Sequence, residues 1–217
     1  GFVRAIVLKA RQLGLSTYVA ARFFQKTALE SGTSTFILSH QAKSTAALFD
    51  MVRRFTEHLP KGVTPGLDTA NKNQLRFSNI SSEYTVGTAG SDDVGRGLTI
   101  RLLHGSEVAF YPANDSLETG LFQAVADLPG TEVILESTAQ GMTNLFYRMT
   151  MAALAGQGLY QVIFIPWFWE PQYALPVSED FSPTEKETEL QRTYNLTNEQ
   201  LYWRRKKIES YGGREFL

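Results

Sequence analysis

A run of nine residues near the start of the chain has the composition of a phosphate-binding loop. Residues 9–17 read KARQLGLST and follow an apolar segment at residues 5–8. A buried strand that passes through a glycine-containing loop into a helix lets backbone N–H groups and the helix N-terminus converge on phosphate. The usual pattern is G-x-x-x-x-G-K-[ST], but here Lys9 stands at the first glycine and Leu15 at the lysine. Taken alone, the run fits equally well a phosphate loop whose cation has moved upstream and an ordinary strand–helix turn.

Each polar residue type in this run has a candidate role. Gly14 permits close approach of the backbone to a ligand, and Lys9 or Arg11 could reach phosphates from the other side of the loop. Ser16 stands where the loop enters the helix, the usual place for a hydroxyl ligand to Mg²⁺, and Thr17 follows in the first turn.

A second segment, residues 100–107, ends an apolar strand with Ser106 and Glu107. Nucleotide hydrolases that use a phosphate loop place carboxylates at this point, where one holds the metal through water and the next polarises the attacking water. Glu107 could act as the base, and Ser106 could hold a metal-bound water but carries no charge. For this segment alone, a surface glutamate just past a strand is the favoured interpretation.

A third segment, residues 133–141, is a strand that ends in small hydroxyl and amide residues. Ser137, Thr138 and Gln140 could each hydrogen-bond phosphate, water or the catalytic carboxylate, as a γ-phosphate sensor does. A plain polar turn is the alternative, and it is the more probable one for the segment alone.

A fourth candidate is Arg96, which lies between two glycines in a loop before the carboxylate strand. Such an arginine could stabilise transition-state charge in its own subunit or across an interface. A structural ion pair with Asp92 or Asp93 is equally consistent with the spacing.

The order of these segments carries more weight than any one of them. The elements that must position them are predicted as strands alternating with helices, which indicates an α/β fold with a mostly parallel sheet. A phosphate loop, a loop arginine, a carboxylate strand and a sensor strand follow in the order of a P-loop NTPase of the ASCE motor type. The predicted strands cover residues 3–8, 35–38, 74–77, 83–87, 100–103, 132–135 and 161–165, and the helices cover residues 16–29, 42–59, 114–125, 144–154, 183–194 and 198–210.

A composition change after Pro166 predicts two domains, an ATPase core at residues 1–166 and a small helical subdomain at residues 167–217. Thr197 and Gln200 predict a capping box at the last helix.

The composition sets further limits on function. The chain has 217 residues, 43% of them hydrophobic, no cysteine and a formal net charge of -1. Disulfides and cysteine metal sites are therefore excluded, and nucleic-acid binding must use a local patch or an assembled ring of subunits. No apolar run approaches the roughly 20 residues that span a bilayer, so no membrane partner is expected. Because the chain begins at Gly1, close to its first strand, we expect a fragment of a longer protein.

The chain resembles the N-terminal ATPase domain of the large terminase subunits of tailed bacteriophages, and the resemblance covers nearly all of it. The segments that carry it are residues 10–17, 95–97, 103–110 and 136–141, with the aromatic residues 166–168 and the helical residues 201–205.

The resemblance implies ATP and Mg²⁺ as cofactors and assigns a role to each candidate. Lys9 is the phosphate lysine, Arg11 a second phosphate contact and Ser16 the Mg²⁺ ligand, while Glu107 is the catalytic base and Arg96 an arginine finger acting on a neighbour's ATP. The ATP-binding residues that it implies are Lys9, Arg11, Gln12, Leu13, Gly14, Leu15, Ser16 and Thr17.

The third segment resembles the coupling motif of the family, so Ser137, Thr138, Gln140 and Gly141 are expected to link hydrolysis to movement. Ser106 departs from the family pattern, which commonly has aspartate there. In this chain it is expected to contact the metal through water only.

The resemblance also implies partners. It implies double-stranded DNA as substrate, the portal protein and small terminase subunit as partners, and a pentameric ring on the procapsid, with the isolated chain a monomer. The expected location is the host cytoplasm, outside the mature virion. No acidic cluster after residue 170 could form a nuclease, so the C-terminal nuclease domain of the family is expected to be absent.

Two alternatives remain open at this point. A helicase-like translocase would share the catalytic parts but normally needs a second motor lobe. A non-catalytic assembly module on a degenerate scaffold is favoured by Leu15 and Ser106. Basic residues at 204–207, Arg53, Arg54 and Lys61 could contact DNA, although such clusters are more often solvated helix faces.

Overall fold

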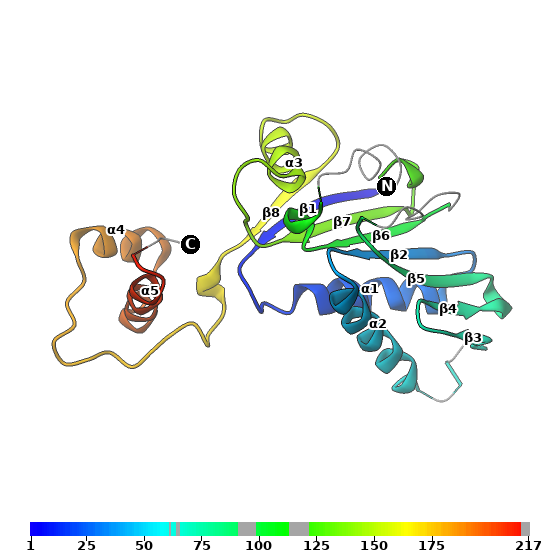
Figure 1. Ribbon diagram of the computed structural model, residues 1–217, viewed down its shortest axis with the longest axis horizontal. Coiled ribbons are helices and arrows are strands. Elements are labelled where there is room, and N and C mark those ends of the chain that lie inside the picture. The colour runs from blue at the N-terminus through cyan, green and yellow to red at the C-terminus, as the bar shows by residue number, and fades with distance from the viewer. Residues whose placement is uncertain (61, 64–65, 91–98, 113–121, 214–217) are drawn as a thin grey trace. The chain divides into compact units, whose positions relative to one another are not determined.

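The computed structural model describes residues 1–60, 62–63, 66–90, 99–112 and 122–213 (Figure 1). It forms two compact units, residues 1–164 and residues 165–217. Arg96 lies outside the described residues, and so does most of the helix expected over 114–125. Of that helix, the described part is a single 3₁₀ turn at Phe122–Ala124.

The first unit is built on an eight-stranded sheet with the order β3-β4-β5-β2-β6-β7-β1-β8. The strands from β5 through β2, β6 and β7 to β1 are paired in parallel, while β3 and β4 join antiparallel at one edge. The prediction of an α/β fold with a mostly parallel sheet is therefore confirmed. The strands are β1 Val3–Lys9, β2 Ser34–Ser39, β3 Thr69–Ala70, β4 Gln74–Phe77, β5 Ser82–Thr88, β6 Leu102–Ser106, β7 Glu132–Ser137 and β8 Gln161–Ile165.

Helices cover both faces of this sheet (Figure 1). Helices α1 (Leu15–Leu29) and α2 (Ala42–Glu57) pack on one face, where Phe23 and Phe24 of α1 are buried. Helix α3 (Leu145–Leu154) lies over the other face and packs on the 3₁₀ turn at Val108–Phe110. The central strands are nearly continuous apolar runs because both of their faces are buried. None of the described helices is both long and apolar enough to cross a membrane.

The structure corrects the predicted bounds of one functional strand. The sequence predicts β6 at residues 100–103, but the strand begins at Leu102 and continues to Ser106. The ladder extends past the apolar run because Ser106 is aligned with Ser39 of β2 and with Glu136 of β7. The short strand β3 lies in a segment predicted to be a loop, and α2 ends at Glu57, two residues earlier than predicted.

The second unit contains two helices, α4 (Glu185–Tyr194) and α5 (Asn198–Ser210). The capping box predicted at Thr197 and Gln200 is present, and a second one joins Thr184 to Glu187 at the start of α4. The centre of the unit is an aromatic stack in which the ring of Trp203 packs against Trp167 and Tyr173, with centroids 5.2 and 4.5 Å away.

The basic run at residues 204–207 is engaged within this same unit. Arg204 is buried, and Arg205 donates to Glu187 at 3.0 Å and lies over the ring of Phe181. Lys206 pairs with Glu209 at 2.8 Å, and the Nζ of Lys207 lies 5.7 Å from the Trp203 ring centroid. The run is therefore not simply a solvated helix face, because these residues make contacts within the unit.

Candidate functional site

The candidate phosphate loop joins the end of β1 to the start of α1. Lys9 is the last residue of β1, and Gly14 is the N-cap of α1, with φ 69° and ψ 4°. Gln12 is also left-handed, with φ 57°, a conformation that costs a non-glycine residue about 1 kcal/mol or more. Arg11 in the loop and Thr17 in the first turn of α1 are both exposed. The loop therefore presents its backbone and the N-terminus of α1 to solvent, as a phosphate site requires.

Lys9 is a buried cation that contacts two carboxylates. Its Nζ lies 3.1 Å from Oε1 of Glu107 and 3.1 Å from Oε2 of Glu136, and its side chain is 6% exposed. Burial alone would lower the pKa of Lys9, but Glu136 and Glu107 raise it above its ordinary value of 10.5. The lysine therefore stays charged at the base of the loop.

Glu136 is the functional candidate that the sequence patterns missed. It is fully buried in β7, and its Oε1 accepts a hydrogen bond from the Ser16 Oγ at 2.7 Å and lies 3.4 Å from the Nε2 of His104. Burial by itself would raise the pKa of Glu136, but His104, Lys9 and Ser16 hold it at about 2. The signal that could have identified it is its position, because a charged residue inside a buried apolar strand is stable only when it has a partner.

Glu107 follows β6 in a strained backbone conformation, with φ 56° and ψ 48°. Its Oε2 accepts hydrogen bonds from the Ser137 Oγ at 3.3 Å and from both the backbone N–H and the Oγ1 of Thr138 at 3.4 Å. Non-glycine residues persist in such conformations where surrounding contacts hold them, and they gather at functional sites. The structure therefore brings Glu107 together with two of the predicted sensor residues.

The remaining predicted residues are placed differently. Ser106 is buried at the end of β6, aligned with Glu136, while Leu13 in the loop and Leu15 at the start of α1 are partly buried. Gln140 and Gly141 are exposed, and the carbonyl oxygen of Gln140 accepts from Asn144 at the start of α3.

The site gathers at one edge of the sheet because the parallel strands end there together. In the ladder, Val7 of β1, Glu136 of β7 and Ser106 of β6 form one row. Aligned residues of parallel neighbours point to the same face, so Glu136 and Ser106 lie on the α1 side, where Ser16 contacts Glu136. Lys9, two residues beyond Val7, points to that side as well.

The donor set fits a magnesium-bound nucleotide. Mg²⁺ in such sites keeps several waters and takes one or two protein ligands together with phosphate oxygens. The Ser16 hydroxyl can supply a ligand, and Glu107 and Glu136 supply charged oxygens nearby. Among the residues that the structure describes, no group of three His, Cys, Asp or Glu side chains is arranged to bind a metal by itself. The residues thus fit an ion shared with a nucleotide.

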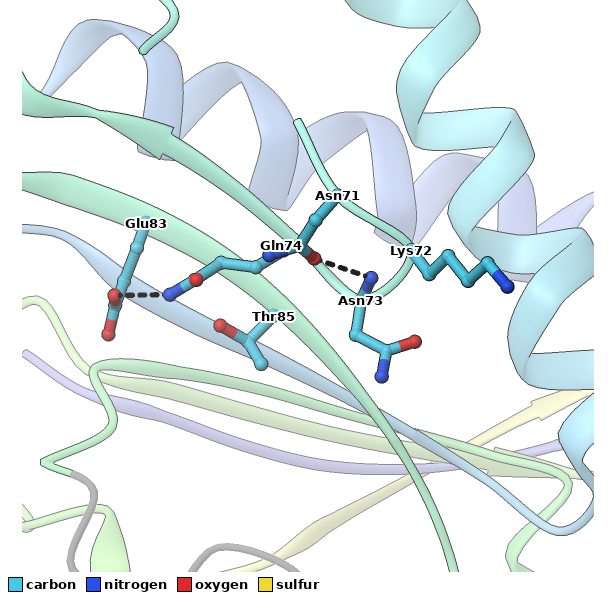
Figure 2. A pocket seen from close by; sticks show the side chains of 6 residues that line it. All are labelled: Asn71, Lys72, Asn73, Gln74, Glu83 and Thr85. Carbon is cyan, nitrogen blue, oxygen red and sulfur yellow. Dashed lines mark hydrogen bonds between the residues drawn. The ribbon is translucent and has the colours of Figure 1, made fainter. Parts of the chain in front are cut away.

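A pocket of about 600 Å³ lies elsewhere on the first unit, beside strands β4 and β5 (Figure 2). Polar side chains line it, with Gln74 donating to Glu83 at 3.0 Å. None of its lining residues belongs to the phosphate loop or to β6 and β7. The chemistry-bearing residues are at the other site, so we do not place the active site here.

Comparison with known proteins identifies the architecture. No family model matches the chain. The large terminase of bacteriophage HK97 is similar with a TM-score of 0.63 and 15% identity over 99% of this chain and 46% of its own. The large terminase ATPase domain of Thermus phage P74-26 is similar with a TM-score of 0.61 and 18% identity, over 99% of this chain and 88% of its own.

The large terminase of a thermophilic bacteriophage, in a structure with ADP, is similar with a TM-score of 0.57 and 13% identity, over 88% of this chain and 44% of its own. This chain therefore spans less than half of the HK97 terminase and of the terminase solved with ADP, but it matches most of the separate ATPase domain. It has the fold of the ATPase domain of phage large terminases.

Proposed function

We propose that this chain is the ATPase motor domain of a viral large terminase, which hydrolyses ATP to move double-stranded DNA into a procapsid. The observation that carries the proposal is the contact of one buried lysine at the phosphate loop with Glu107 and Glu136, beside the Ser16 hydroxyl. The likeness to a terminase ATPase domain, and to a large terminase solved with ADP, supports the same conclusion.

In this proposal the loop binds the phosphates of ATP. Backbone N–H groups around Gly14 and the N-terminus of α1 face the phosphate oxygens, and Lys9 and Arg11 supply positive charge. The Ser16 hydroxyl is the protein ligand to Mg²⁺, which neutralises phosphate charge when bound. Because Lys9 already contacts Glu107, an incoming phosphate competes with that carboxylate for the lysine.

Glu107 is the proposed general base. It takes a proton from a water whose oxygen bonds to the γ-phosphorus, while the bond from that phosphorus to the β,γ-bridging oxygen breaks and ADP leaves. Ser137 and Thr138 contact the same carboxylate, so a movement of the Glu107 side chain changes hydrogen bonds at the end of β7. Together with Gln140 and Gly141 they are the proposed coupling segment, and Arg96 is the proposed arginine finger.

The remaining proposals concern the whole protein. We propose a core at residues 1–166, a helical subdomain at residues 167–217, a ring assembly on a procapsid in the host cytoplasm, and contacts to portal and small terminase subunit. Of the alternatives, a non-catalytic module is less favoured, because Lys9 contacts Glu107 at the phosphate loop although Leu15 stands at the usual lysine position.

The test is ATP hydrolysis by the protein with and without double-stranded DNA. Glu107→Gln is expected to lower turnover by about 10²- to 10⁴-fold and to leave nucleotide binding in place, because it removes the base without changing shape. Glu83→Gln, which removes a carboxylate hydrogen-bonded to Gln74 on β4, is the matched control and should hydrolyse normally. Wild-type turnover in Glu107→Gln would contradict the assignment of the base.

A further inference from the structure

Glu136 is a buried carboxylate to which the proposed mechanism gives no role. We propose that Glu136 on β7 positions the water shell of the nucleotide-bound Mg²⁺. Ser106, the aligned residue on β6, carries no charge with which to do this. This inference rests on the proposed function, because it concerns the metal that accompanies the nucleotide.

The register of the sheet allows a carboxylate on either β6 or β7 to occupy this row. Glu136 and Ser106 are direct partners in the parallel β6–β7 ladder, so their side chains point to the same face. Moving the carboxylate from one strand to the next therefore shifts it sideways within a single row. The charge stays at the edge of the sheet where the phosphate loop begins.

The contact with Ser16 places this carboxylate beside the metal ligand. Ser16 donates from its Oγ to the Glu136 Oε1 at 2.7 Å, and this hydroxyl is the proposed metal ligand. A carboxylate that hydrogen-bonds a metal ligand orients that ligand and raises its basicity. Glu136 is also buried and paired with Lys9, and these contacts hold its carboxylate beside Ser16.

The charge balance at the loop indicates why a metal is needed. Lys9 contributes one positive charge, and Glu107 and Glu136 contribute two negative charges. Even with the positive charge proposed for Arg11, these side chains sum to zero, so a polyphosphate that enters the loop brings excess negative charge unless a cation accompanies it. Two carboxylates around one lysine therefore favour nucleotide that arrives with Mg²⁺ over free nucleotide.

A purely structural role for Glu136 would be pairing with Lys9 alone. The same strand offers the comparison, because Glu132 is also buried and pairs with Arg22 and Lys26 at 2.9 and 2.7 Å. Glu132 lies at the opposite end of β7, away from the loop. Glu136 differs from it by its contact with the loop hydroxyl of Ser16, which a simple ion pair does not require.

The experiment measures the affinity of the protein for a fluorescent ADP, first in EDTA and then across a Mg²⁺ titration. Glu136→Gln is expected to weaken the Mg²⁺ effect by about ten- to a hundredfold, as loss of a residue that orients a metal ligand does. Affinity in EDTA should stay equal or rise, because a negative charge near the phosphates is gone. Glu132→Gln is the matched control and should keep the wild-type Mg²⁺ effect.

Three results separate the possibilities. An unchanged Mg²⁺ effect in Glu136→Gln overturns the inference, and so does an equal loss of affinity with and without Mg²⁺, which would mean that Glu136 acts only through Lys9. Wild-type protein that binds no ADP would instead reject the proposed function, and the inference with it.

The double variant Ser106→Asp, Glu136→Gln returns the carboxylate to β6. It is expected to recover the Mg²⁺ effect, and it also restores the charge around Lys9 if Glu136→Gln alone fails to fold. A folded double variant with no Mg²⁺ effect would show that a carboxylate on β6 cannot replace the one on β7.

Discussion

Replacing Lys9 with methionine should destabilise the protein by about 3–5 kcal/mol at neutral pH. The change removes a cation that lies 3.1 Å from each of two carboxylates, one of them fully buried. At an effective dielectric constant of about 20, each contact is worth roughly 5 kcal/mol before the cost of desolvation. Measured losses when one partner of a buried pair is removed are about 3–5 kcal/mol.

The pH dependence of this loss is a sharper signature than its size. In the wild type, the pKa of Glu136 is about 2, below its ordinary value of 4.5, so this stabilisation is complete above pH 4.5 and is lost as the pH falls toward 2. Without Lys9 the two carboxylates repel, and the folded protein takes up a proton that the unfolded chain does not bind. The variant should therefore gain stability as the pH is lowered from about 7 toward 5.

Urea denaturation at about pH 7 and about pH 5.5 measures both effects. Lys26→Met is the matched control: it removes a lysine 2.7 Å from buried Glu132, but Arg22 remains paired with that carboxylate. The control should lose about 1 kcal/mol and show no gain at the lower pH. A loss below about 1 kcal/mol in Lys9→Met, or a loss that does not shrink on acidification, would refute the described charge arrangement.

Three further predictions concern the packing and charge of other residues. Gly105→Ala places a Cβ 2.7 Å from the Leu135 Cδ2, so urea denaturation should show a loss of about 1–3 kcal/mol from overpacking. Trp203→Ala removes the ring stacked 4.5 Å from Tyr173, and thermal unfolding followed by near-ultraviolet circular dichroism should show residues 165–217 losing about 3–5 kcal/mol. Glu136→Gln should make the free energy of unfolding less dependent on pH between 4.5 and about 2, measured by urea denaturation at about pH 3 and pH 6, because the group that titrates there is gone.

The sheet could be predicted from the sequence because its central strands are short apolar runs bounded by turn residues. Val3–Lys9 and Glu132–Ser137 are both recognisable in this way, with bounds within two residues. The end of β6 could not be predicted because Ser106 belongs to the ladder through its backbone pairing with β2 and β7. Hydrogen bonding between strands distant in the sequence leaves no trace in local hydrophobicity.

The site could be predicted only in part, for the same reason. Lys9, Ser16 and Glu107 are identified from local patterns, and the structure brings Lys9 into contact with Glu107. Glu136 contacts both Lys9 and Ser16, but its place beside them depends on the register between β7 and its neighbours, which no local pattern contains. The roles of all four residues remain predictions for the experiments above.

The row formed by Val7, Glu136 and Ser106 has a consequence for how such chains are found. If either β6 or β7 can carry the negative charge of this row, selection would preserve one carboxylate in the row without fixing which strand carries it. Relatives would then trade a carboxylate between two positions that are distant in the sequence, and each position would look variable when scored alone. A search that scores positions 106 and 136 jointly would recover chains that a search for an acidic pair after one strand passes over.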